Sequence, residues 1–172
     1  MNSTIYNQET KRLKLRKLKK EDSLFIYKLV NSEGWLKFIG ERNIHNTTDA
    51  SKYIENIINK DKVIYWVATL KDNTQIGIIT LIKRDYLEFY DIGFAFLPSH
   101  YNKGYAFEAA NTVLNYIKKS TDFRTILAST HPQNRSSIKL IEKLGLSFYK
   151  TDTQEKEALS LYKLDLDKFK ID

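Results

Sequence analysis

Apolar and polar residues alternate along the chain with two different periods, which predicts a fold built from both strands and helices. Residues 63–70 and 75–82 are rich in β-branched and aromatic residues and flank a short polar break, the pattern of a hairpin. A third strand follows, so the middle of the chain is expected to form an antiparallel meander. The expected strands are 13–16, 63–70, 75–82, 87–97, 124–130, 147–149 and 159–166.

Other segments carry apolar residues at the three- and four-residue spacing of a helix. Thr47, Thr48 and Asp49 offer N-cap groups for the second of them, whereas residues 34–41 are expected to be irregular. The expected helices are 23–30, 47–60, 106–118 and 134–145. Together the two patterns predict an α/β fold with a mixed, mostly antiparallel seven-stranded sheet and about four helices.

The stretch from Phe94 to Ala110 joins an apolar strand to a helix through a basic loop that contains Gly104. Gly104 lets the backbone approach a ligand closely, and the first amides of the helix lack intrahelical acceptors. These amides, the helix dipole and the charge of Lys103 suit a pyrophosphate group. Because the dipole contributes only about 0.3–1 kcal/mol, several amides must converge for useful affinity. We expect an anion cradle here; the alternative is an ordinary turn between a strand and a helix.

The strand before this loop, the helix after it and the strand at 124–130 form a β-α-β unit. Its two strands are therefore expected to be parallel neighbours in the sheet.

The composition limits the classes of protein that fit the pattern. At 172 residues the chain suits one domain, and its net charge of +7 favours a polyanionic ligand or an acidic surface. The basic residues are spread out, apart from a run between Lys11 and Lys20, so a solvated face explains them equally well. The three histidines match no metal motif, and no metal is expected. Without a leader-like or long apolar segment, the chain is expected to be cytoplasmic and without a membrane span.

The loop sequence Tyr101-Asn102-Lys103-Gly104-Tyr105-Ala106 resembles the acetyl-CoA-binding motif of the GNAT N-acetyltransferases, usually written Q/R-x-x-G-x-G/A. Tyr101 stands where Gln or Arg is commoner. Asn102 replaces a frequent Gly, and Asn tolerates a positive φ better than other residues with a side chain.

A second stretch, Asn134 to Leu146, resembles the N-x-x-S-x-x-L/I-x-x-K-x-G-F element of the GNAT branch that acetylates ribosomal-protein N-termini and of its small-molecule relatives. Asn134 is placed to cap this helix and Gly145 to end it in the left-handed conformation. The resemblance extends from about Leu13 to Leu166 and identifies residues 1–172 as a single GNAT domain.

This resemblance implies a GNAT-like sheet in which the two parallel strands splay apart. The pantetheine arm of acetyl-CoA would enter the gap and bond to the backbone of the strand before the loop, and Asn134 would bond it while capping its helix. The implied cofactor-binding residues are Phe94, Phe96, Leu97, Tyr101, Asn102, Lys103, Gly104, Tyr105, Ala106 and Asn134.

Acetyl transfer to an amine needs a neutral amine and a proton source for the departing thiolate. Glu88 and Asp91 lie nearest to where the family keeps a base, and Asp91 is favoured because it precedes Ile92-Gly93-Phe94 as an acid often does in related sequences. Either residue can equally be an exposed carboxylate at a strand end, with a backbone carbonyl or a water chain accepting the proton instead.

Ser137 resembles the serine that is proposed in this branch to protonate the sulfur of CoA. A hydroxyl in the first turn of a helix is the alternative interpretation. Tyr149 and Tyr162 are further candidates for the acid, since many GNAT enzymes use a tyrosine.

The sequence therefore predicts an acetyl-CoA-dependent N-acetyltransferase. Because the chain has no cysteine for an acyl intermediate, the amine is expected to attack acetyl-CoA directly. A ribosomal-protein N-terminus is the preferred acceptor; a small-molecule amine such as a polyamine, amino acid or antibiotic, or a non-catalytic acyl-CoA sensor, are the alternatives. Nucleic-acid binding is disfavoured because most aromatic residues lie inside apolar strands. The oligomeric state is left open, with a homodimer as one option.

Overall fold

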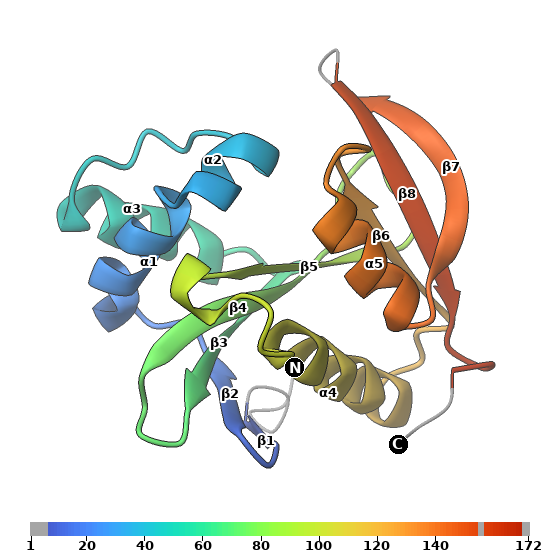
Figure 1. Cartoon of the computed structure of the whole chain (residues 1–172), viewed down its shortest axis with the longest axis horizontal. Helices are drawn as coiled ribbons and strands as arrows, with labels where there is room; N and C mark the ends of the chain where they lie inside the picture. The colour runs from blue at the N-terminus through green and yellow to red at the C-terminus, as the bar shows by residue number, and fades with distance from the viewer. Residues whose placement is uncertain (1–6, 155–156, 170–172) are drawn as a thin grey trace.

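One mixed sheet runs through the computed structural model, which describes residues 7–154 and 157–169 (Figure 1). The strand order is β1-β2-β3-β4-β5-β6-β8-β7, and all neighbours are antiparallel except β5 and β6, which are parallel. The strands are β1 (Gln8–Glu9), β2 (Leu13–Lys17), β3 (Val63–Leu70), β4 (Gln75–Ile82), β5 (Tyr90–Phe96), β6 (Thr125–Thr130), β7 (Ser147–Gln154) and β8 (Glu157–Asp165). The predictions of a mostly antiparallel sheet and of a parallel β-α-β pair are confirmed.

The sheet in the described residues has eight strands, so the predicted number of seven was wrong. The additional strand is β1, whose two polar residues pair with Leu15 and Lys14 of β2. A strand this short carries no apolar alternation, so the pattern of the sequence could not indicate it. Strand β5 begins at Tyr90 rather than Leu87, because residues 85–89 form a turn and a bend.

The described residues form five α-helices: α1 (Ser23–Val30), α2 (Glu33–Phe38), α3 (Thr47–Ile58), α4 (Tyr105–Ser120) and α5 (Arg135–Lys143). Short 3-10 turns occupy Lys20–Asp22 and Pro98–His100. Helix α2 lies where an irregular segment was expected, since six residues are too few to show a helical period. The N-cap of α3 is Asn46, whose side chain accepts from the Asp49 amide at 2.9 Å, and not one of the three residues after it.

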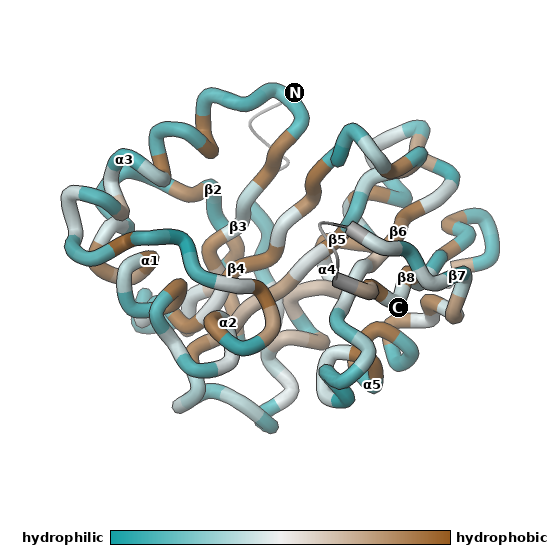
Figure 2. Tube along the Cα trace, turned by 90° about the horizontal axis from the view of Figure 1, so that it is seen from above, coloured by the Kyte–Doolittle hydropathy of each residue, from teal (hydrophilic) through white to brown (hydrophobic). Residues whose placement is uncertain are grey.

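Successive side chains on the strands enter cores on opposite faces of the sheet. Trp66 contributes to the core beneath α4 and α5, whereas its neighbour Val67 contributes to the core beneath α1 and α3. The same division appears in Figure 1, where α1, α2 and α3 lie apart from α4 and α5. Figure 2 shows hydrophobic residues along the central strands, whereas the outer helices mix hydrophobic and hydrophilic residues. Over the described residues, no helix is long and apolar enough to cross a membrane.

Strands β5 and β6 touch only at one end. In the described residues they pair at Tyr90 with Ile126 and at Asp91 with Leu127, and no further pair follows. Beyond these residues β5 continues along β4, and β6 continues along β8. The two strands therefore splay apart, as the resemblance implied, and we call the space between them the strand opening.

Candidate functional site

The edge of β5 that faces the strand opening is set by its pairing with β4. The amide of Leu97 donates to the Ile76 carbonyl at 2.8 Å, so the backbone groups of Leu97 point toward β4. Backbone groups of neighbouring residues point to opposite sides of a strand. Phe94 and Phe96 consequently present their N–H and C=O groups to the opening. This geometry fits the expected role of their backbones and leaves the Leu97 amide committed to the sheet.

The loop after β5 turns through two positions with positive φ, Asn102 at 59° and Gly104 at 77°. Gly104 is the N-cap of α4, and no side chain caps the helix there. Among the described residues, no oxygen accepts a hydrogen bond from the amides of Gly104, Tyr105 or Ala106. These donors lie on exposed or half-buried backbone at the positive end of a sixteen-residue helix. The loop therefore has the free amides that an anion cradle requires, and we call residues 102–106 the cradle.

Two cationic groups lie beside the cradle. Lys103 Nζ donates to the carbonyl of Ser99 at 2.9 Å, which places its charge next to the 3-10 turn before the loop. Arg12, just before β2, donates from Nη1 to the carbonyl of Lys103 at 3.0 Å. Sequence reasoning missed Arg12, because ninety-one positions separate it from Lys103. A basic residue in a basic N-terminal run gives no signal of that contact.

The side chain of Tyr101 is turned toward α2. A Cβ added to Gly34 would lie 2.6 Å from the Tyr101 hydroxyl, so the two residues are in close contact. Burial raises the pKa of Tyr101, and the charge of Glu33 raises it further. The structure thus places this residue between the cradle loop and the helices that cover the other face of the sheet.

Asp91 lies where β5 and β6 separate, and its carboxylate is 3% exposed. Its Oδ2 accepts from Arg84 Nε at 2.7 Å and from Ser129 Oγ at 2.9 Å, and its Oδ1 accepts from the Ser129 amide at 3.0 Å. In a continued parallel ladder that amide would donate to a backbone carbonyl of β5. The Asp91 side chain therefore takes over a ladder bond at the point where the ladder ends.

The surroundings of Asp91 determine its protonation. Burial raises the pKa of its carboxyl. The charge and hydrogen bond of Arg84, and the hydrogen bonds of Ser129, oppose that rise. Glu88, the other carboxylate considered as a base, lies outside β5 in the preceding bend and is exposed. The fold brings Asp91 to the strand opening, but both of its oxygens already have partners.

Helix α5 begins at the far side of the opening, directly after β6. Asn134 is 8% exposed, and its Oδ1 accepts from the Ser137 amide at 3.2 Å and from Ser136 Oγ at 2.9 Å. The expected N-cap is thus confirmed. Because the cap uses the backbone amide of Ser137, the hydroxyl of this half-buried residue is not needed to hold the helix. Gly145 has φ 89°, which confirms the expected left-handed end of the helix.

The two tyrosines considered as acids have different surroundings. Tyr162 is 5% exposed and packs edge-on against Phe148, and burial raises the pKa of its hydroxyl. Tyr149 is 48% exposed on the edge strand β7, with the ammonium of Lys163 5.2 Å from its ring.

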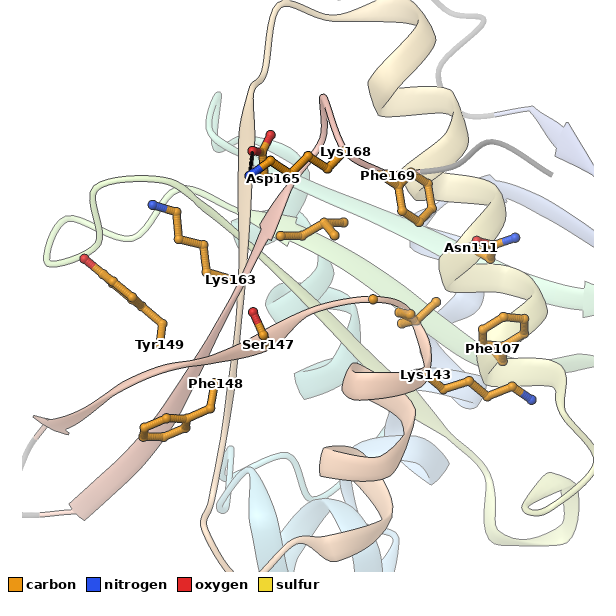
Figure 3. Close-up of a pocket in the computed structure, with 13 residues that line it drawn as sticks. Phe107, Asn111, Lys143, Ser147, Phe148, Tyr149, Lys163, Asp165, Lys168 and Phe169 are labelled. Carbon is orange, nitrogen blue, oxygen red and sulfur yellow. Dashed lines mark ion pairs between the residues drawn. The ribbon is translucent and has the colours of Figure 1, made fainter.

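A separate groove of about 670 Å³ lies between α4, the end of α5 and the β7–β8 hairpin (Figure 3). Figure 3 shows Phe107 of α4 and Lys143 of α5 side by side, and the Lys143 ammonium is 4.4 Å from the ring centre. Of the expected acids the groove contains only Tyr149, and it contains none of the expected cofactor-binding residues. We therefore place the candidate site at the strand opening and the cradle, where most of the expected residues meet.

Comparison with known proteins agrees with this geometry. A family model described as "Acetyltransferase (GNAT) domain" matches residues 12–147. The chain is 29% identical over 137 residues to the "Uncharacterized N-acetyltransferase YnaD" of Bacillus subtilis (strain 168), covering 80% of each chain.

Two solved acetyltransferases share the fold. Spermidine N-acetyltransferase from Vibrio cholerae, in complex with CoA and spermine, matches with a TM-score of 0.80 at 19% identity, over 93% of this chain and 99% of that one. RimL, a ribosomal L7/L12 alpha-N-protein acetyltransferase in complex with CoA, matches with a TM-score of 0.80 at 13% identity, over 92% and 96%. Since the family model spans most of the sequence and the sheet opens as described, this chain belongs to the GNAT family of N-acetyltransferases.

Proposed function

We propose that the protein transfers the acetyl group of acetyl-CoA directly to a primary amine. The observation that carries the proposal is the strand opening itself, which leads from the unpaired edge of β5 to the free amides at the start of α4. Acetyl-CoA is long and ends in phosphates, so it matches an extended backbone edge that continues into an anion cradle. Both solved structures described above are complexes with CoA.

Different residues at the strand opening and the cradle would bind different parts of acetyl-CoA. The amides of Gly104, Tyr105 and Ala106, with the charge of Lys103, would hold the diphosphate. The backbones of Phe94 and Phe96 would pair with the pantetheine amides. Because Asn134 Oδ1 is occupied by the cap of α5, its amide nitrogen is the group that remains to bond the cofactor.

Acetyl-CoA supplies an activated thioester. The reaction also needs a group that donates a proton to the departing sulfur and a group that accepts a proton from the amine. We assign the acid to Ser137, whose hydroxyl at the start of α5 would donate a proton to the sulfur as it leaves. We assign no base to Asp91, because Arg84 and Ser129 already occupy both of its oxygens. Glu88 is exposed and lies before β5, so water or a backbone carbonyl at the opening would accept the proton of the amine.

The preferred acceptor is a protein N-terminus, and a ribosomal protein is the class to test first. An α-amine with a pKa of 7.7–8.0 is about one tenth neutral at pH 7, whereas a lysine-like amine near 10.4 is neutral in only a few parts in ten thousand. A site without a free carboxylate base therefore suits the α-amine. A polyamine also needs unpaired carboxylates to bind its several charges, and the buried carboxylate at the opening is already paired with Arg84.

The experiment measures acetyl-CoA binding by calorimetry and then acetyl transfer to a panel of amines. We expect micromolar binding by the wild type and none by Gly104→Asp, which adds a side chain and a negative charge at φ 77° in the cradle. We also expect faster transfer to peptides with ribosomal N-termini than to spermidine or free amino acids. Binding without transfer to any amine would favour an acyl-CoA sensor, and the absence of binding would refute the proposal.

A further inference from the structure

The cradle is held from outside by residues of the N-terminal segment. Arg12 forms an ion pair with Glu108 in the first turn of α4, with Nη2 2.6 Å from Oε2 and Nε at the same distance from that oxygen. Its other terminal nitrogen, Nη1, donates to the Lys103 carbonyl at 3.0 Å. Thr10 Oγ1 and the backbone amide of Arg12 both donate to the other carboxylate oxygen, Glu108 Oε1. One guanidinium thus joins the cradle loop to the helix that follows it.

The contact with Lys103 has a consequence for the next amide. In a trans peptide unit the C=O and N–H bonds point in opposite directions, because the unit is planar. The Lys103 carbonyl and the Gly104 amide belong to the same unit, so a bond that holds this carbonyl toward Arg12 turns the Gly104 N–H away from Arg12. An anion cradle needs its N–H groups turned toward the ligand and its carbonyls turned away.

The ion pair with Glu108 has a second consequence. Glu108 is a carboxylate in the first turn of α4, beside amides that would bind phosphate. Without a partner its charge would repel a diphosphate, whereas Arg12 neutralises it. A Cβ on Gly104 would lie 3.4 Å from Arg12 Nη2, which shows how closely the guanidinium approaches the cradle. The ring of Tyr105, the first residue of α4, stacks 4.7 Å from the guanidinium carbon.

We infer that Arg12 is a positioning residue for binding of the cofactor diphosphate. It orients the Gly104 amide through the Lys103 carbonyl and cancels the charge of Glu108, with Thr10 holding that carboxylate in place. The inference rests on the proposed use of acetyl-CoA, and it adds a requirement for residues that lie more than ninety positions away from the cradle.

The test compares Arg12→Gln and Arg12→Lys with Arg16→Gln. Arg16 is a matched control, because it lies in the same segment and forms a bidentate pair with the buried Asp22, at 2.9 and 2.7 Å, instead of touching the cradle. The dissociation constants of CoA and of dephospho-CoA are measured by calorimetry. Pantetheine lacks the diphosphate, and its dissociation constant is measured by chemical-shift titration, which can determine millimolar values.

We expect Arg12→Gln to raise the dissociation constants of CoA and dephospho-CoA at least tenfold and to change that of pantetheine less than twofold. Arg12→Lys should lie between this variant and the wild type, because an ammonium cannot bridge Glu108 and Lys103 as a planar fork does. Adding Glu108→Gln to Arg12→Gln should restore part of the affinity, since it removes the repelling charge but not the loss of orientation. Arg16→Gln should lower thermal stability while leaving all three constants within twofold.

The inference would be overturned if Arg12→Gln raised the dissociation constants of all three ligands equally. It would also be overturned if Arg12→Gln raised the dissociation constant of CoA no more than Arg16→Gln does. If the wild type binds CoA and both Arg12 variants bind it as tightly, the inference fails and the proposed function stands. If the wild type binds no CoA, both the inference and the proposed function fail.

Discussion

Replacement of Asp91 by asparagine separates a structural role from a catalytic one. The amide keeps the shape of the carboxylate but removes its charge, and one of its two ends becomes a donor that faces Arg84 Nε or the Ser129 amide. The structural interpretation predicts a large loss of stability, because Asp91 is 3% exposed and bonds three donors at 2.7–3.0 Å. The catalytic interpretation predicts a loss of turnover with little effect on stability.

The size of the stability effect follows from the exposure of the partners. Breaking a buried ion pair costs about 3–5 kcal/mol, and the low end applies because the Arg84 side chain is 37% exposed and can regain water. An unsatisfied buried amide at Ser129 adds about 1 kcal/mol. The sum of about 4 kcal/mol is a large part of the roughly 5–15 kcal/mol that keeps a domain folded. At about 2–4 °C per kcal/mol, the unfolding midpoint should fall by about 8–16 °C.

Calorimetric unfolding at pH 7 provides the midpoint, and steady-state kinetics at a temperature where both proteins are folded provides kcat. We expect kcat of Asp91→Asn to remain within about tenfold of the wild type. Arg84→Met should destabilise by a similar amount, and the double variant by less than the sum, since the two residues interact. A midpoint within about 2 °C of the wild type, with kcat reduced a hundredfold or more, would refute this reasoning and make Asp91 the base. Glu88→Gln, at an exposed position, is the control for stability.

Three further outcomes are expected. Ser137→Ala should lower kcat about 100-fold, the low end for a positioned acid, while the calorimetric dissociation constant of CoA stays within twofold; an unchanged kcat would exclude the acid role. Gly77→Ala should lower the unfolding midpoint by about 2–12 °C, because its Cβ would lie 2.4 Å from the ring of Phe96; a stable variant would show that the ring moves freely. Burial tends to raise the pKa of Glu108, but the hydrogen bonds from Thr10 and Arg12 lower it by more. The stability that this carboxylate adds is therefore fully present above its unfolded pKa of about 4.3. That stability is lost as the pH falls through the lower pKa of the folded state. Urea unfolding between about pH 5 and 3 should therefore show a steeper loss of stability for the wild type than for Glu108→Gln. Parallel curves would contradict a stabilising role of the bonds from Thr10 and Arg12 to Glu108.

The parts of the fold that were predictable are those whose cause lies within a few residues. The hairpin of β3 and β4 has the boundaries that its β-branched runs indicated. The cap at Asn134 and the left-handed conformation of Gly145 follow from local backbone chemistry, and the sequence predicted both. The parallel pairing of β5 and β6 followed from the β-α-β order alone.

The parts that were not predictable depend on contacts between distant residues. Glu108 was visible as an acidic residue in the first turn of α4, but its partner Arg12 is ninety-six positions away. Asp91 was visible as a carboxylate in the strand before the loop, but its partner Ser129 lies on another strand, thirty-eight positions later. No periodicity relates such residues, because only the order of the strands brings them together.

Two ion pairs share a physical role at the site, Arg84 with Asp91 and Arg12 with Glu108. The opening has one carboxylate where its strands separate, Asp91, and one beside its cradle, Glu108, and each is neutralised by an arginine from a neighbouring segment. A ligand that carries several phosphate charges meets amides and cations there, and no unpaired charge from either carboxylate. If either arginine were absent, the nearby carboxylate would oppose the ligand at short range, where the local dielectric is lower than that of water. The arrangement therefore favours an anionic cofactor, in agreement with the proposed use of acetyl-CoA.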